Sequence, residues 1–223
     1  MAQIGVGCAL AAEGNTVIVK GLAHAGPCHI SCQVGVGDVV ATVDGAPVGG
    51  DVKLAKRLFL GEAETGITIG LLRNGTIRNV HLLRSKPIET RQPREGEVCG
   101  IGCTLSTVKD GLAITKIAPG SPAQLSGELQ AMDVIVSINS IDMVSKTPAD
   151  AATLVLGPVG TRVELTIVRG RGSRRLVEIV RAQPLDSGSL QKAAVYRYNS
   201  LVQQQMLAYP WLRRMQRRSA NAK

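Results

Sequence analysis

The sequence predicts a mainly β protein made of two similar domains in tandem, each a partly open barrel or sandwich of five or six short strands with two helices. Three observations predict this fold class. The chain repeats itself at a spacing of about 95 residues, short β-branched runs dominate each repeat, and only two segments per repeat carry helix signals. With 223 residues, the chain is long enough to bury two modest cores.

The internal repeat extends along the whole of each unit. In the first glycine-containing stretch, the matched residues are Gly5, Gly7, Cys8 and Leu10 with Gly100, Gly102, Cys103 and Leu105. Further on they are Pro27, Ser31, Asp38 and Val39 with Pro122, Ser126, Asp133 and Val134, then Leu58, Gly61, Thr65 and Arg73 with Leu154, Gly157, Thr161 and Arg169. Identities spread this widely indicate a duplicated domain rather than a chance motif.

Each repeat contains runs that are typical of short strands. Residues 16–22 (TVIVKGL) and 112–117 (LAITKI) are β-branched runs behind a glycine-containing turn. Residues 38–45 (DVVATVDG) and 133–140 (DVIVSINS) are apolar runs that end in a turn, as expected of a central buried strand. Residues 66–84 alternate with a period of two around an Asn-Gly pair, which predicts a hairpin.

The helices are predicted from the residues at their ends. Ser121 lies directly before a proline and predicts the N-cap of a one-turn helix. Thr147 and Asp51 are the expected N-caps of the longer helix in the second and first repeat, respectively. Gly157 and Gly61 follow these helices and are expected to stop them.

These elements divide the chain into residues 1–84, a first domain, and residues 98–182, a second domain. The polar, proline-bearing residues 85–97 between them predict a linker. Residues 183–223 form a basic tail that contains aromatic residues. Seven Lys and Arg against Asp186 give this tail +6 of the formal net charge of +9, so the body and the tail differ in chemistry.

The tail permits three interpretations. Its apolar residues form a loose helical stripe of Leu190, Ala194, Tyr198, Leu201 and Val202, which Pro210 interrupts. Trp211 lies beyond that proline among several arginines. The tail is thus a partly disordered segment or a helix that packs back on the second domain, a contact for an anionic membrane surface or acidic partner, or a nucleic-acid binder.

The stretches GVGC (residues 5–8) and GIGC (residues 100–103) indicate an anion site in each domain. Glycines allow backbone conformations that turn successive N–H groups toward one point, where an anion binds. A strand that leaves such a loop beside a helix offers an open edge and a groove. An extended peptide adds to such an edge, with its terminal carboxylate in the loop.

Both domains resemble PDZ domains, whose signature is a glycine-containing carboxylate-binding loop. The second repeat carries the more diagnostic match, in residues 118–143 (APGSPAQLSGELQAMDVIVSINSIDM) and 147–169 (TPADAATLVLGPVGTRVELTIVR). It resembles most the PDZ modules of C-terminal-processing proteases. The resemblance covers Gln3–Arg84 and Glu97–Arg181, about three quarters of the chain, and is weaker in the first repeat.

The resemblance implies which residues contact a peptide. The carboxylate would meet the backbone N–H groups of Val6, Gly7 and Cys8, and of Ile101, Gly102 and Cys103. The pocket for the last ligand side chain would be lined by Leu10 with Phe59, and by Leu105 with Val155. The long helix would present Val52 and Lys56 in the first groove, and Pro148 and Ala152 in the second.

Departures from the family pattern imply differences in specificity. Cysteine replaces the usual phenylalanine in both loops, which implies a wider or shallower pocket. Val52 and Pro148 offer no polar side-chain group, so neither groove is expected to prefer Ser or Thr at the third-from-last ligand position, and the first groove is expected to favour apolar residues there. Lys56 favours an acidic ligand side chain. Only Met1–Ile4 precede the first loop, so we expect a truncated first strand and weak binding in the first domain.

The sequence gives no support for catalysis. The protease relatives use a serine activated by a lysine on a separate domain. Here Ser85-Lys86 and Ser145-Lys146 are adjacent pairs whose side chains point apart, so we expect no catalytic residue. The cysteine spacing does not match a structural zinc site, and we expect no metal, no cofactor and no small-molecule substrate.

The expected function is that of a non-catalytic adaptor, located in the cytoplasm with reduced thiols and in peripheral contact with membranes through its tail. It would bind the C-terminal or extended peptides of proteins, mainly apolar ones, by β-strand addition. Two alternatives stay open. One is the regulatory PDZ portion of a C-terminal-processing serine protease, and the other is a membrane-surface or nucleic-acid binder led by the basic tail.

Overall fold

The computed structural model describes residues 3–90, 94, 97–170 and 172–208. The first domain contains β1 (Cys8–Glu13), β2 (Thr16–Leu22), α1 (Pro27–Ser31), β3 (Val39–Val43), β4 (Ala46–Pro47), α2 (Val52–Phe59), β5 (Gly66–Arg73) and β6 (Thr76–Leu83). The second contains β7 (Val98–Cys99), β8 (Cys103–Val108), β9 (Gly111–Ile117), α3 (Pro122–Ser126), β10 (Val134–Ile138), β11 (Ile141–Asp142), α4 (Pro148–Val155), β12 (Gly157–Pro158), β13 (Arg162–Val168) and β14 (Arg174–Val180). A last helix, α5 (Ser187–Ala208), follows.

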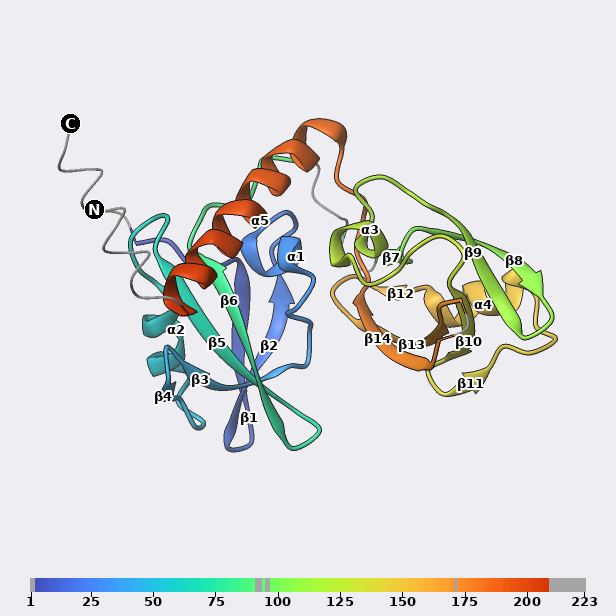
Figure 1. Ribbon diagram of the computed structural model, residues 1–223. Helices are drawn as coiled ribbons and strands as arrows, with labels where there is room; N and C mark the ends of the chain where they lie inside the picture. Colours follow the sequence, from blue (N-terminus) through green and yellow to red (C-terminus); the bar gives the residue numbers. More distant parts are fainter. Residues whose placement is uncertain (1–2, 91–93, 95–96, 171, 209–223) are drawn as a thin grey trace.

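The two domains share one sheet topology (Figure 1). The first sheet has the strand order β1-β2-β3-β5-β6, with β4 paired to β3. The second has the corresponding order β8-β9-β10-β13-β14, with β11 paired to β10. All pairs within both sheets are antiparallel. The predicted fold class, two mainly β units with few helices in tandem, is confirmed.

Each sheet closes around its own apolar core. Val17, Val40 and Ile69 lie on three neighbouring strands of the first sheet and are almost fully buried. Ile114 and Ile135 belong to the corresponding strands of the second core. Burying one such side chain contributes about 1.5–3 kcal/mol, so the β-branched runs of the sequence stabilise the sheets they form.

The predicted N-caps are confirmed. The side chains of Ser121 and Asp51 accept hydrogen bonds from the backbone of α3 and α2, respectively. Thr147 and Asp150 form a reciprocal capping box at the start of α4. The hairpin between β5 and β6 turns at Asn74 and the residue after it, with φ angles of 48° and 75°, as an Asn-Gly turn requires.

The expectation that Gly61 and Gly157 stop the helices is wrong. The residues before them, at the ends of α2 and α4, already have extended backbones, and neither glycine has a positive φ. Each glycine instead leaves room for a buried arginine. A Cβ atom at Gly61 would lie 2.8 Å from Nε of Arg84, and one at Gly157 would lie 2.9 Å from Nε of Arg181.

These two arginines cap the C-terminal ends of α2 and α4. Arg84 donates to the carbonyl groups of Phe59 (3.1 Å) and Leu58 (2.9 Å). Arg181 donates to those of Val155 (2.6 Å) and Leu154 (2.9 Å). Because the last carbonyl groups of a helix have no partner within it, a buried guanidinium fixes the position of each helix end.

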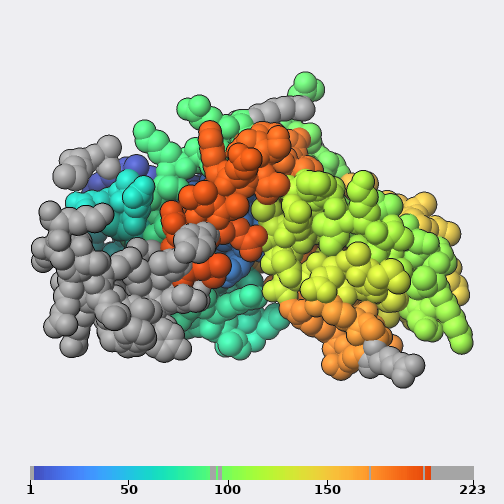
Figure 2. Space-filling model, turned by 45° about the horizontal axis from the view of Figure 1, so that its top comes forward, coloured from blue at the N-terminus to red at the C-terminus, as the bar shows by residue number. Residues whose placement is uncertain are grey.

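The tail forms α5, which packs mainly across the first domain, as Figures 1 and 2 show, and also contacts Leu125 of the second. The predicted stripe is confirmed at Leu190, which packs against a buried cluster, and is wrong at Ala194 and Leu201, which are exposed. The packed side of α5 carries Ala193, Tyr196 and Ser200 instead. The predicted contacts of Tyr198 and Val202 lie outside the described side chains, and those of Pro210 and Trp211 outside the described residues.

Tail, linker and both domains meet in one small apolar cluster. It contains Ala25 and Ile30 of the first domain, Leu125 of the second, and Leu185 and Ala193 of the tail. Ile88 from the segment between the domains packs against this cluster. The two domains are thereby held together by apolar contacts that neither domain contains alone.

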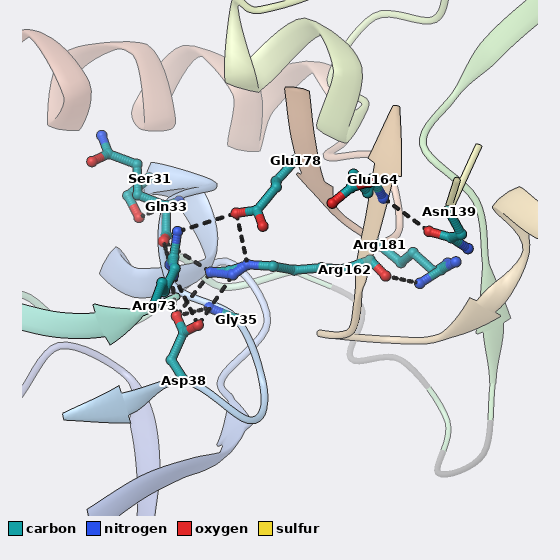
Figure 3. Close-up of polar contacts among 10 residues, drawn as sticks. All are labelled: Ser31, Gln33, Gly35, Asp38, Arg73, Asn139, Arg162, Glu164, Glu178 and Arg181. Atoms are coloured by element: carbon teal, nitrogen blue, oxygen red, sulfur yellow. Dashed lines mark hydrogen bonds and ion pairs between the residues drawn. The ribbon is translucent and has the colours of Figure 1, made fainter. Parts of the chain in front are cut away.

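An ion-pair network also joins the domains (Figure 3). Asp38 is buried in the first domain and accepts from Arg73 of the same domain at 2.7 Å. Arg162 of β13 reaches the same carboxylate from the second domain at 2.8 Å. Beside this network, the N–H group of Val36 donates to the carbonyl group of Gly160 at 2.8 Å. Breaking one partner of such a buried network leaves a charge uncompensated.

We predict that replacing Arg181 by Met lowers the free energy of unfolding by about 3 kcal/mol. Met has a similar length, but it leaves the carbonyl groups at the end of α4 without donors in a buried place. Urea unfolding of the full chain measures the effect. Arg174→Met is the matched control, because Arg174 is exposed at the start of β14, the strand that Arg181 directly follows. Equal stabilities of the two variants would contradict the capping role.

Candidate peptide groove of the second domain

The glycine loop of the second domain turns its amide groups away from the protein. The carbonyl group of Ile101 accepts from Ala123 N at 2.9 Å, and that of Gly102 accepts from Ala118 N at 2.8 Å. Within a trans peptide unit the N–H group points opposite to the C=O group, so the N–H groups of Gly102 and Cys103 face outward. Among the described residues, the N–H groups of Ile101 and Gly102 donate to no protein acceptor.

The loop of the first domain has the same construction. The carbonyl groups of Val6 and Gly7 accept from Cys28 N (2.9 Å) and Ala23 N (2.8 Å). Within the described part of the chain, the N–H groups of Val6 and Gly7 likewise have no acceptor. Both repeats therefore contain a small nest of amide donors, of the kind that binds an anion.

The second glycine of each loop is required by its backbone. Gly102 has φ +79° and Gly7 has φ +71°, a region in which side chains are strained. Space is restricted as well, since a Cβ atom at Gly102 would lie 2.3 Å from the Cβ atom of Ser121, the N-cap of α3. The close approach of loop and helix depends on this glycine.

Seven of the residues predicted for the second groove lie together around one cavity of about 440 Å³. They are Ile101, Gly102, Cys103, Leu105, Pro148, Ala152 and Val155. The cavity is bounded by the glycine loop, the edge strand β8 and the helix α4. Apart from Thr104 and the thiol of Cys103, the side chains that line it are apolar, so a peptide that binds there finds main-chain donors beside a mainly apolar surface.

The sequence reasoning missed Ile135 and Leu156, which also line this cavity. Ile135 lies on the central strand β10, where its apolar neighbours predict a core residue and nothing more. Leu156 directly follows α4 and is 50% exposed. The sequence could not show that Leu156 is exposed beside a groove, because the exposure of a side chain depends on the fold.

The corresponding residues of the first domain lie differently. Leu10 and Phe59 are 7% and 5% exposed and belong to the first core. Val52 is half-buried against the same core, and Lys56 is exposed. By contrast, the second groove has half-buried residues at the positions that match Leu10 and Phe59. The ring of Phe59 packs into the core of the first domain. Its shorter counterpart, Val155, lines the open groove of the second domain.

The first strand of the family pattern is reduced in the first domain. Ile4 and Gly61 exchange two backbone hydrogen bonds, of 2.8 and 3.0 Å, and form an isolated bridge. In the second domain the corresponding contact is the two-stranded pairing of β7 with β12. In the described residues, this pairing is therefore one residue shorter in the first domain than in the second.

The cysteines of the loops are not poised for chemistry. All five cysteines of the chain are free. Burial and the nearby carboxylate of Asp133 raise the pKa of Cys103 to about 12, so this thiol is protonated at neutral pH. Burial also raises the pKa of Cys28, and a hydrogen bond with Cys8 raises it further. These thiols pack in the domains as small apolar groups.

The histidines have packing roles. His29 Nδ1 accepts a hydrogen bond from Ala25 N at 2.8 Å, which requires an unprotonated nitrogen. Burial and the neighbouring His24 lower the pKa of His29 to about 4, in agreement with that role. His81 shares a 2.8 Å hydrogen bond with Thr68. The described residues contain no group of three or more side chains suited to hold a metal ion.

The fold and the groove define the second domain as a small β module with an amide nest beside an open edge strand. The profile of the PDZ domain family matches residues 114–169. The chain therefore contains a PDZ domain.

Proteases are among the proteins similar to this chain. The periplasmic pH-dependent serine endoprotease DegQ of Escherichia coli (strain K12) is 32% identical over 151 residues, which cover 64% of this chain and 32% of that protein. The chloroplastic carboxyl-terminal-processing peptidase 2 of Arabidopsis thaliana is 36% identical over 106 residues, which cover 44% of this chain and 20% of that protein. The chain spans about a third or less of the length of these relatives.

One similar solved structure is the PDZ domain of the carboxy-terminal protease from Vibrio cholerae in complex with a peptide. It is 30% identical, with a TM-score of 0.35, and the match covers 38% of this chain and 95% of that domain. The matches to proteases cover only the PDZ region, which is non-catalytic. In the part of the chain that the structure describes, no helix has the length and apolar character needed to cross a membrane.

We predict that Gly102→Ala lowers the free energy of unfolding by about 3 kcal/mol, because strain of the left-handed backbone adds to the clash with Ser121. Gly127→Ala is the matched control. Gly127 has a similar φ of +70° but no atom within 4 Å of the added Cβ, so its loss should be about 1 kcal/mol. Chemical denaturation of both variants measures the difference, and equal losses would show that the loop and α3 are not tightly packed.

Proposed function

We propose that the chain is a non-catalytic peptide-binding unit whose second domain captures the C-terminus of a partner protein. One observation carries this proposal: the outward-facing N–H groups of Gly102 and Cys103, next to the N–H group of Ile101, lie at one end of a mainly apolar groove between β8 and α4. A terminal carboxylate accepts from the amides, and the preceding residues extend along β8 as an added strand. The last ligand side chain then occupies the pocket between Leu105 and Val155.

The proposal assigns an apolar ligand to this groove. Pro148 and Ala152, which line the helix side, offer no charge and no side-chain hydrogen bond. Ser or Thr at the third-from-last ligand position would be desolvated there without a partner. Apolar residues at the last and third-from-last positions are therefore preferred.

The first domain has a supporting role in this proposal. Its amide nest is present, but Leu10 and Phe59 are packed into its core. We regard it as a PDZ-like copy, the first of a tandem pair, that binds peptides weakly. Should its groove open, two linked sites would gain avidity for a clustered partner, and Lys56 would favour an acidic ligand side chain.

A second candidate function is the regulatory PDZ portion of a serine protease that processes C-termini. The similarity to DegQ and to the carboxyl-terminal-processing peptidase favours it, together with the small share of those proteins that the chain spans. In that case the groove would present a substrate C-terminus to a separate catalytic domain. Immunoblotting of the native protein distinguishes the two, since a mass well above 23.5 kDa favours the protease portion.

A location in the cytoplasm and a contact of the tail with an anionic membrane surface or acidic partner remain predictions. The predicted contact depends on the arginines that follow Trp211, and these lie beyond residue 208, outside the described residues.

We expect a labelled peptide with valine at its last and third-from-last positions to bind the full chain, as measured by fluorescence anisotropy. Amidation of its C-terminus should weaken binding by about ten-fold or more, because the amide nest loses a charged acceptor. Threonine at the third-from-last position should weaken it as well. Equal affinity of the amidated and the free-acid peptide would reject the proposed function.

Two variants assign the site to one domain. Ala152→Arg places a bulky cation on the groove side of α4 and should weaken binding by about ten-fold or more. Lys56→Ala changes the corresponding position of the first domain and should leave affinity within about two-fold. The opposite pattern would place the peptide in the first domain.

A further inference from the structure

A second cavity, of about 640 Å³, lies between the two domains and shares no lining residue with the peptide groove. Its wall is formed by the end of α1, the β5–β6 hairpin, the segment that begins at the end of α3, strands β13 and β14, and α5. Figure 3 shows part of it, where Arg73, Arg162 and Glu178 converge.

The edges of both sheets border this cavity. β6 and β14 are the last strands of their sheets, so one side of each has no neighbouring strand. Arg84 exchanges backbone hydrogen bonds with Glu64 and Thr65, which turns its backbone groups inward. Because inward and outward pairs alternate along an antiparallel strand, the backbone groups of Leu83, His81, Asn79 and Ile77 face outward.

Helix α5 occupies one half of this edge. The hydroxyl group of Tyr196 accepts from Leu83 N and donates to Leu83 O, both at 2.9 Å. Ser200 donates to the carbonyl group of His81 at 3.2 Å. Within the described residues, the outward backbone groups of Ile77 and Asn79 have no such partner. This open half of the edge begins at the cavity, which Ile77 lines.

The cavity carries an excess of positive charge. Its lining includes five arginines, Arg73, Arg78, Arg162, Arg175 and Arg197, against two glutamates, Glu128 and Glu178. Asp38 and Glu178 balance Arg73 and Arg162, and Glu128 balances Arg175.

Among the residues that the structure describes, two of these cations have no carboxylate partner. Arg197 donates to the neutral carbonyl group of Leu125. Arg78 is exposed and pairs with no acceptor in the described part of the chain. Burial lowers the pKa of Arg162, and the nearby cations Arg73 and Arg78 lower it further, which agrees with the crowding of positive charge.

Apolar side chains complete the site. Ile77 on β6 is 50% exposed and Leu176 on β14 is 57% exposed, and both line the cavity. A free phosphate or a nucleic-acid backbone would make no use of these side chains or of an open strand edge. An extended peptide uses all three features, namely main-chain pairing, cations for its carboxylates and an apolar surface.

We propose that this cleft binds an extended acidic segment of a partner protein, which adds as a strand to the open edge at Ile77–Asn79 and pairs its carboxylates with Arg78 and Arg197. The segment needs no free C-terminus, so the site is independent of the groove in the second domain. Basic residues dominate the tail of this chain, so the tail is not the acidic segment, and the proposal assigns it to a partner protein.

The test uses the full chain and a fluorescein-labelled hexapeptide of alternating glutamate and valine, amidated so that the amide nest gains no carboxylate. We expect saturable binding that weakens with salt. Arg78→Gln should weaken it by about five-fold or more. Arg174→Gln, an exposed arginine that does not line this cavity, is the matched control and should change affinity by less than about two-fold.

A second pair of variants tests the strand addition. Asn79→Pro removes an outward-facing N–H group and should weaken binding by about ten-fold, because proline cannot donate to an added strand. Asn79→Ala keeps that group and should bind as the original chain does. Ala152→Arg, which alters the peptide groove, should have no effect here.

Absence of saturable binding, or equal affinities of the Arg78→Gln variant and its control, would overturn the proposal. The proposal would also be overturned if tripolyphosphate or a single-stranded oligonucleotide displaced the peptide and bound the Asn79→Pro variant as tightly as the original chain. That result would assign the cleft to a polyanion instead.

Discussion

The placement of the carbonyl groups in the glycine loop determines what the second domain offers to a ligand. Ile101 O and Gly102 O are held by the segment around α3, so the adjoining N–H groups have to face outward. Glycine adopts the left-handed backbone conformation at residue 102 with the least strain, and a side chain there would collide with Ser121. The loop, the start of α3 and the mouth of the groove are therefore one rigid unit, whose donors are oriented before a ligand arrives.

Both domains contain this loop construction, whereas the side chains beside it differ. Both loops use the same carbonyl contacts, and both long helices are anchored by a buried arginine, Arg84 or Arg181. The difference lies in the side chains: Phe59 fills the core of the first domain, where Val155 leaves space in the second. One copy has an open groove, and the other contributes the surface on which α5 packs.

Local signals in the sequence predicted much of this structure. The Thr147 capping box and the Asn74 turn act over a few residues and are confirmed. Contacts between distant residues could not be predicted in this way. The true roles of Gly61 and Gly157 depend on arginines more than 20 residues further along the chain. The docked side of α5 and the clamp of Arg162 on Asp38 depend on how the domains sit together, which no local pattern encodes.

The most direct measurement of the central claim is an amide NMR titration of the full chain with a peptide that ends in a free carboxylate. The account predicts that the N–H resonances of Ile101, Gly102 and Cys103 shift most and move downfield, as donors to a charged acceptor do. The same peptide with an amidated end should leave them nearly unchanged. Identical shifts with both peptides, or the largest shifts outside this loop, would contradict the account.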